Sequence, residues 1–182
     1  MMSIEAPPPG TSLALDNNTF THWRNRHQYV EDAITAYQKE FKVLPALTSI
    51  TVFEALHGIE DDIVKKGGLI DPWKHAIDRI DALVMNCTVL PLNETAAAIA
   101  AHIFPRLMPR LRREKRKKAW ADIFIAATVM AHNYGLVTND NDFKMIADLL
   151  PEGRRLYATA WRPNLTVVPP TVPSGSSSVP KN

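Results

Sequence analysis

The sequence predicts an α/β domain built around a mostly parallel β-sheet, and three observations support this. Short apolar runs alternate with long segments of helical periodicity along most of the 182 residues. Hydrophobic residues make up 46% of the chain and charged residues 22%, which suits a soluble protein with a core. Carboxylates follow two of the short apolar runs, and in parallel sheets sites form beyond the carboxyl ends of the strands.

The candidate strands are short and apolar. Ser12–Leu15 reads SLAL and ends at Asp16, as expected for a buried strand. Parallel neighbours would be joined by right-handed helical connections. The further candidate strands are Leu44–Thr48, Thr88–Leu90, Leu136–Thr138 and Tyr157–Trp161.

The segments between these runs have helical periodicity. Tyr29–Phe41 carries apolar side chains on one face. Ser49 is expected to cap the helix Ile50–Lys66, and Asn93 to cap a helix that runs toward Leu111. The other predicted helices are Asp71–Met85, Trp120–Asn133, which ends near Gly135, and a helix after a turn within Asp140–Leu150.

The composition changes at both ends of the chain. Residues 1–10 hold three consecutive prolines and are expected to be a flexible leader, residues 11–162 form the domain, and residues 163–182 are a Pro/Ser-rich tail expected to be disordered. No stretch approaches the roughly 20 apolar residues that span a bilayer, and the N-terminus lacks the basic region of a signal peptide. Cys87 is the single cysteine, so we expect a cytoplasmic protein without an intramolecular disulfide.

Four carboxylates are candidates for one acidic site. Asp16 and Asp140 follow candidate strands, Glu54 lies about one turn into a helix, and Asp122 begins an apolar helix where an unpaired charge is costly. A divalent cation such as Mg²⁺ relieves the repulsion between converging carboxylates. Taken singly, each acid also fits a helix cap, a surface position, an early-helix position or a turn. The prediction therefore depends on all four together.

Four segments around these acids occur in a recognisable order. Together they resemble the motifs of the PIN-domain family, most of all the VapC-type toxins of toxin–antitoxin pairs, over Ser12 to Leu150. Asn17 stands where threonine is more usual in that family, but the acid before it is retained. The four segments are Leu15–Phe20 (LDNNTF), Ser49–Gly58 (SITVFEALHG), Ala121–Thr128 (ADIFIAAT) and Leu136–Phe143 (LVTNDNDF).

The resemblance implies a three-layer α/β/α fold and an endoribonuclease that depends on Mg²⁺ or Mn²⁺. It implies that Asp16 and Asp122 bind the metal, and that Glu54 and a fourth acid complete the catalytic site. The fourth acid is Asp140, which fits the strand end, or Asp142, which precedes a phenylalanine. The resemblance also implies a homodimer and inhibition by an antitoxin protein.

A dense basic run from Arg106 to Lys118 leads to Asp122, with Glu114 as its only acid. Such a run contacts phosphates without sequence specificity, and we predict that it binds RNA. An acidic antitoxin segment would fit the same surface. The alternative is a solvated helix C-terminus, where the helix dipole favours cations. The residues expected to contact RNA are Arg110, Arg112, Arg113, Arg116, Lys117 and Lys118.

Two rival functions stay open. A non-catalytic PIN scaffold would bind a partner protein and act in DNA-bound regulation, although the four intact acids weigh against it. A phosphatase of the haloacid-dehalogenase type needs a second Asp where this chain has Asn18.

Ser49 and Thr51 have no His/Asp relay that would make a nucleophile. A zinc site is not indicated either, because the histidines are not spaced like zinc ligands. These histidines are His57, His75, His102 and His132.

Overall fold

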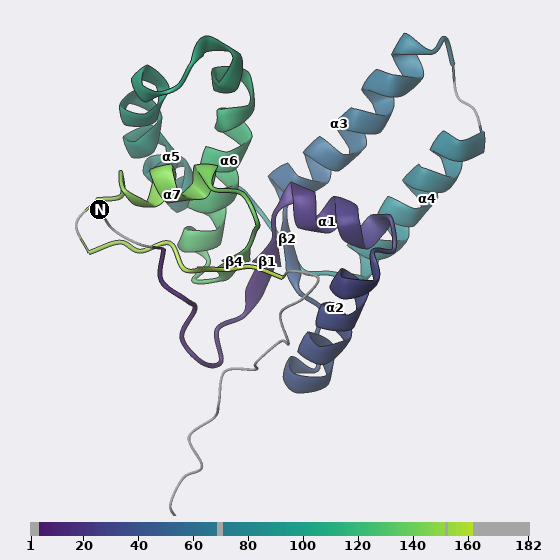
Figure 1. Cartoon of the computed structure of the whole chain (residues 1–182), viewed down its shortest axis with the longest axis horizontal. Coiled ribbons are helices and arrows are strands. Elements are labelled where there is room, and N and C mark those ends of the chain that lie inside the picture. The colour runs from purple at the N-terminus through teal and green to yellow at the C-terminus, as the bar shows by residue number, and fades with distance from the viewer. Residues whose placement is uncertain (1–3, 69–70, 152, 162–182) are drawn as a thin grey trace, which may run out of the picture.

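The central element is a parallel sheet. The computed structural model describes residues 4–68, 71–151 and 153–161, and for Lys117 the backbone. Within these residues the sheet has five strands in the order β3-β2-β1-β4-β5, and every neighbouring pair is parallel (Figure 1). The strands are β1 Leu13–Leu15, β2 Ala46–Thr48, β3 Val89–Leu90, β4 Gly135–Val137 and β5 Ala158–Thr159.

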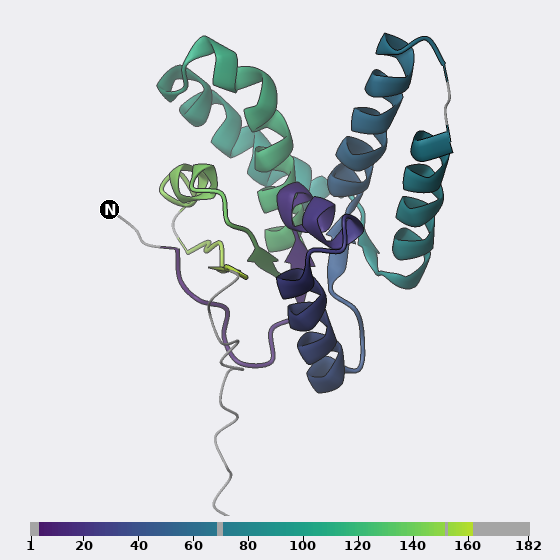
Figure 2. The ribbon, with the colours of Figure 1, turned by 45° about the vertical axis from the view of Figure 1, so that its right-hand side comes forward.

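Helices cover both faces of this sheet. Figures 1 and 2 show α5, α6 and α7 on one side and α1 to α4 on the other. Successive strand residues point to opposite faces, so Ala14 packs with α5 to α7 whereas Leu15 packs with α1 to α4. The predicted three-layer α/β/α architecture is confirmed. The helices are α1 Asn17–Arg24, α2 Gln28–Phe41, α3 Ser49–Lys65, α4 Asp71–Asn86, α5 Glu94–Leu107, α6 Arg113–Ala131 and α7 Asp142–Ala147.

Helix α1 was not predicted from the sequence. Its asparagines and threonines have low helix propensity, which hides it from pattern analysis. The side chains of Phe20 and Trp23 are buried in the core on the α1–α4 side of the sheet. Tertiary packing of this apolar face therefore stabilises a helix that its local sequence disfavours.

Several helix ends differ from the prediction. The N-cap of α3 is Thr48 and not Ser49, because Thr48 has extended backbone and its Oγ1 accepts from the Thr51 N–H at 3.0 Å. Helix α5 ends at Leu107 and continues as a short 3₁₀ turn over Met108–Arg110. Helix α6 begins at Arg113, well before Trp120, and the residue with positive φ after it is Asn133, whereas Gly135 lies in β4. The cap at Asn93 is confirmed, with its Oδ1 accepting from the Ala96 N–H at 2.9 Å.

The first described residues pack at the β5 side of the sheet. Glu5 forms a parallel bridge with Tyr157 and an ion pair with Arg155 at 2.8 Å. Pro7 packs so closely on Gly135 that a Cβ there would lie 2.8 Å from the proline Cγ. Part of the leader expected to be flexible is thus held against the domain. The predicted tail over 163–182 lies outside the described residues, and no helix among the described residues is long and apolar enough to cross a membrane.

Candidate active site

The strand order places a topological switch point at the carboxyl edge of the sheet. The chain moves outward from β1 to β2 on one side and from β4 to β5 on the other, so the topology reverses between β1 and β4. Crevices for ligands form at such switch points. Asp16 directly follows β1, and Asp140 lies shortly after β4. Two acids that the sequence places far apart thus lie beyond neighbouring strand ends.

Asp16 is both a helix cap and a member of this acid cluster. It is 2% exposed, and its Oδ1 accepts from the backbone N–H of Thr19 at 2.6 Å. Its Oδ2 accepts from the hydroxyl of Thr138, also at 2.6 Å. Burial raises the pKa of Asp16, while the hydrogen bonds from Thr138 and Thr19 act in the opposite direction. The two roles that the sequence allows for Asp16, as a helix N-cap and as an acid of the site, are therefore compatible.

Glu54 from α3 and Asp122 from α6 reach the same edge. Burial and the charge of Asp16 raise the pKa of Glu54 to about 6. Burial raises the pKa of Asp122 to about 7, and the charges of Asp140, Glu54, Asp142 and Asp16 add to this effect, in that order. A carboxyl whose pKa is raised by several acidic neighbours marks a candidate functional site. The predicted acids are thus brought together.

Asp140 and Asp142 have different surroundings. The Oδ1 of Asp140 accepts from the backbone N–H of Asp142 at 2.8 Å, which stiffens the turn before α7. Asp142 forms an ion pair with Lys115 of α6, with Nζ 3.0 Å from Oδ1. The charge of Asp140 also acts more strongly on Asp122 than that of Asp142 does. Asp142 thus has a cationic partner, and Asp140 has the larger electrostatic effect on Asp122.

The donor set suits a hard divalent cation that keeps part of its water shell. Among the described residues, no group of three or more His, Cys, Asp or Glu side chains is placed so that it could hold a metal ion. Mg²⁺ commonly takes one or two carboxylates and keeps several waters, so it does not require such a cage. The like charges that raise the pKa of Asp122 are those that a cation would offset. The side-chain oxygen of Asn17, next to Asp16 in the chain, is also buried without a hydrogen-bond partner in the described structure.

Threonine hydroxyls that the sequence analysis did not single out as site residues hold the acids in place. Besides Thr138, the hydroxyl of Thr51 donates to the carbonyl of Leu15 at 3.3 Å, at the end of β1. Thr48 and Thr51 also share a hydroxyl hydrogen bond of 2.9 Å. Both threonines are fully buried, so they stabilise the strand end. The position of Thr51 and Thr138 within the motif segments, and of Thr48 directly before one, was the signal that could have identified them.

The basic run lies at the start of a helix. Arg110 ends the 3₁₀ turn, Arg112 precedes α6, and Arg113 begins it. The alternative of a dipole-favoured helix C-terminus is therefore wrong for most of the run, because cations at an N-terminus face the unfavourable end of the dipole. The described side chains are exposed, and that of Lys117 is outside the described structure.

Only part of the run faces the acids. Lys118 lies four residues before Asp122, one turn away on the same face of α6. Lys115 is on that side too, because it pairs with Asp142. Arg113 lies toward the other side of the helix by the same spacing.

The remaining candidate groups take no part in the cluster. His57 stacks on Phe53 with ring centroids 5.4 Å apart, and His132 contacts the carbonyl of Pro91 at 3.0 Å. Burial raises the pKa of Cys87 to about 11, so its thiol stays protonated at neutral pH. The two histidines thus contact a neighbouring ring and a backbone carbonyl.

The protein is thus a parallel α/β/α domain in which acidic side chains gather at the topological switch point of the sheet. The chain belongs to the PIN-domain family, since the model of the PIN domain matches residues 13–149. All five predicted acids lie inside the matched segment.

Solved structures share this fold. The chain is 17% identical to a chain of VapBC2 from Rickettsia felis, crystallised with a DNA fragment from the promoter, with a TM-score of 0.61 over 82% of this chain and 98% of the other. For DNA-bound VapBC from Salmonella typhimurium the identity is 16% and the TM-score 0.61, over 84% and 99%. For FitAcB from Neisseria gonorrhoeae the values are 23% and 0.52, over 80% and 95%. No similar sequence is found among the curated proteins.

Proposed function

We propose that this protein is a metal-dependent endoribonuclease, the toxin of a toxin–antitoxin pair. The observation that carries the proposal is the convergence of acids at the switch point, where Asp122 has its pKa raised to about 7 by burial and four acidic neighbours. Mutually repelling carboxylates at the carboxyl edge of the sheet are suited to binding Mg²⁺ or Mn²⁺.

Asp16 and Asp122 would hold the metal, and Glu54 and Asp140 would complete the site. A bound divalent cation would lower the pKa of a water molecule, and its positive charge would offset the negative charge of the scissile phosphate. The protein supplies orientation: Thr138 and the N–H of Thr19 fix both oxygens of Asp16. Glu54, with a pKa of about 6, is suited to accept a proton near neutral pH.

RNA as the substrate is supported by the cations beside the acids. Lys115 and Lys118 lie on the acid-facing side of α6, at the edge that a phosphate backbone would approach. The other basic residues of the run extend this cationic surface along the start of α6. The exposed positions place their charges in solvent, where they can contact a polyanion.

A partner protein is proposed by analogy with the structures that share the fold. Two of these are VapBC complexes bound to DNA. We infer that this chain likewise binds an antitoxin. The homodimer expected from the sequence remains a prediction, which the mass of the purified protein in solution tests.

The rival function is a scaffold without catalysis that acts within a DNA-bound complex. The DNA-bound structures named above make it worth testing. The two functions are distinguished by the same measurement. Metal-dependent cleavage by the chain alone excludes the scaffold, whereas its persistent absence from folded, antitoxin-free protein favours it.

The test is cleavage of total RNA by the purified chain with Mg²⁺, with Mn²⁺ and with EDTA. Asp16→Asn is the informative variant, because asparagine retains an oxygen to accept from Thr19 and so keeps the cap of α1. Asp81→Asn, at an exposed position of α4, removes one charge away from the cluster and serves as the control. Fragments that require metal, persist with Asp81→Asn and vanish with Asp16→Asn support the proposal. Cleavage by Asp16→Asn at the parent rate would overturn it.

A further inference from the structure

The turn that joins α1 to α2 is a second cationic surface. This segment, His22–Tyr29, is called the α1–α2 turn below. It contains Arg24 and Arg26, and no acid occurs anywhere between Asn17 and Val30. Arg26 and its neighbours up to residue 28 are exposed, and Arg24 is partly exposed. A positive surface of this kind attracts an anionic ligand.

Three flat rings gather on the same turn. The rings of His22 and His27 lie 4.6 Å apart between centroids, and Tyr29 lies edge-on to both at 5.8 and 6.1 Å. The hydroxyl of Tyr29 is hydrogen-bonded to the Nδ1 of His22. His27 is exposed and the other two rings are partly exposed. Accessible rings interleaved with arginines are a combination that binds single-stranded nucleic acid, because every base has a face that can stack.

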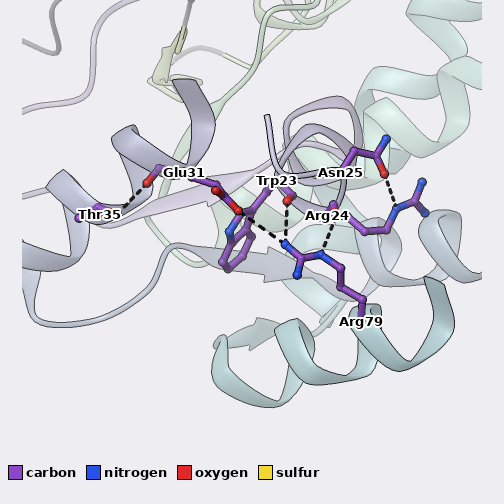
Figure 3. A network of polar contacts seen from close by, with 6 residues as sticks. All are labelled: Trp23, Arg24, Asn25, Glu31, Thr35 and Arg79. Carbon is purple, nitrogen blue, oxygen red and sulfur yellow. Dashed lines mark hydrogen bonds and ion pairs between the residues drawn. The ribbon is translucent and has the colours of Figure 1, made fainter. Parts of the chain in front are cut away.

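The turn is held rigidly by α4. Figure 3 shows the guanidinium of Arg79 beneath the turn, where Nε donates to the carbonyl of Arg24 at 2.6 Å and Nη2 to that of Trp23 at 3.4 Å. Arg79 also pairs with Glu31 at 3.7 Å. The side chain of Arg24 points away from Arg79 in the same view. A surface that is ordered in advance loses less entropy when a ligand binds.

The turn lies close to the acid cluster. Asp16 caps the N-terminus of α1, and this helix of eight residues, roughly 12 Å long, ends in the turn. Burial raises the pKa of Tyr29, and the negative charge of Asp16 adds to this effect, so Tyr29 lies within electrostatic range of the acid cluster. Helices α1 and α6 cover opposite faces of the sheet. The turn and the basic start of α6 therefore belong to the two helical layers on either side of the sheet whose carboxyl edge carries the acids.

We propose that the α1–α2 turn binds unpaired nucleotides of the RNA strand that crosses the acid cluster, with Arg24 and Arg26 at phosphates and His27 and Tyr29 against bases. The inference rests on the proposed nuclease function and adds a second contact to it. It also predicts a preference for single strands, because bases in a duplex are not free to stack on protein rings.

The test measures binding by the full chain carrying Asp122→Asn, with a labelled oligouridylate and a labelled RNA duplex at several salt concentrations. The variant pair Arg24→Gln and Arg26→Asn removes both charges while suiting the backbone, because asparagine tolerates the positive φ of 59° at position 26. We expect the affinity for oligouridylate to fall about tenfold and the salt slope to decrease by about 1.4, as for two lost phosphate contacts. Lys39→Gln with Lys74→Gln removes two exposed charges elsewhere, and we expect a change below about twofold.

Substitutions of His27 test the stacking. At pH 8, His27→Ala should weaken binding several-fold with an unchanged salt slope, and His27→Phe, which keeps a flat ring, should restore it. Equal affinities for the arginine variant and the lysine control would overturn the inference, and so would an absence of RNA binding. The nuclease proposal is judged separately by cleavage with the unsubstituted chain. A chain that binds RNA through the turn without cutting it would refute only the nuclease.

Discussion

Thr138 donates its hydroxyl to the Oδ2 of Asp16 at 2.6 Å, although 122 residues separate them in the chain. This hydrogen bond joins the end of β4 to the end of β1 across the switch point. It also opposes the effect of burial on the pKa of Asp16, because it stabilises the charged carboxylate. The arrangement of the cluster thus depends on a neutral side chain as much as on its acids.

Replacing Thr138 by valine should impair the site without unfolding the protein. Valine has nearly the same shape, but leaves the buried Oδ2 of Asp16 without this donor, which costs about 1–3 kcal/mol of stability. The pKa of Asp16 should rise further, so the acid limb of the pH profile of cleavage should move to higher pH. Thr138→Ser should restore the parent profile because it keeps the hydroxyl. A valine variant with the parent melting temperature and pH profile would contradict this account.

Asp122 should make the metal-free protein less stable as the pH rises. Its folded pKa of about 7 exceeds its ordinary value of 3.8, so between these values the folded state binds more protons than the unfolded state. The free energy of unfolding therefore falls as pH rises through this window. Asp122→Asn should flatten the dependence, measured by denaturant unfolding in EDTA at several pH values from 4 to 8. Parallel pH curves for the variant and the parent would refute this explanation.

Metal binding should show the complementary dependence on pH. Protons compete with a cation for Asp122 and for Glu54, whose pKa is about 6. Mg²⁺ should therefore raise the melting temperature more at pH 8 than at pH 5, and cleavage should increase over the same interval. An equal shift at both pH values would show that these carboxyl groups do not bind the metal.

Substitutions should separate the roles of Asp140 and Asp142. Asp140→Asn keeps an oxygen that can accept from the N–H of Asp142, yet should lower the rate of cleavage about 10- to 100-fold. Asp142→Asn removes a partly exposed ion pair with Lys115, which contributes about 0.2–1 kcal/mol to stability, and should leave cleavage close to the parent rate. The reverse ranking of the two rates would identify Asp142 as the fourth acid.

The two sides of α6 should contribute unequally to RNA binding. Lys118→Gln, one turn from Asp122, should weaken RNA binding several-fold and reduce the salt slope by about 0.7. Arg113→Gln removes the same charge from the other side of the helix and should have a smaller effect on affinity and on cleavage. Equal losses for both variants would mean that the strand wraps around the start of α6.

The fold was largely readable from the sequence where local pattern and tertiary packing agree. β1, β2 and β4 are short apolar runs buried on both faces, so their composition alone identifies them. The amphipathic helix α2 was predicted almost to its ends. Helix α1 was missed because its local propensity is poor, and its burial through Phe20 depends on core partners that are remote in sequence.

The sequence by itself determined which residues could form the site: acids after apolar runs, in an order shared with the PIN-domain family. The tertiary structure decided how they are arranged. Strand order brings Asp16 and Asp140 to adjacent strand ends, and the pairing with Lys115 sets Asp142 apart from Asp140, which the sequence already placed at the strand end. The same holds for the α1–α2 turn, whose proximity to Asp16 follows from the packing of α1. Charges and hydrogen bonds act through space over a few ångströms, and those distances are set only when the chain is folded.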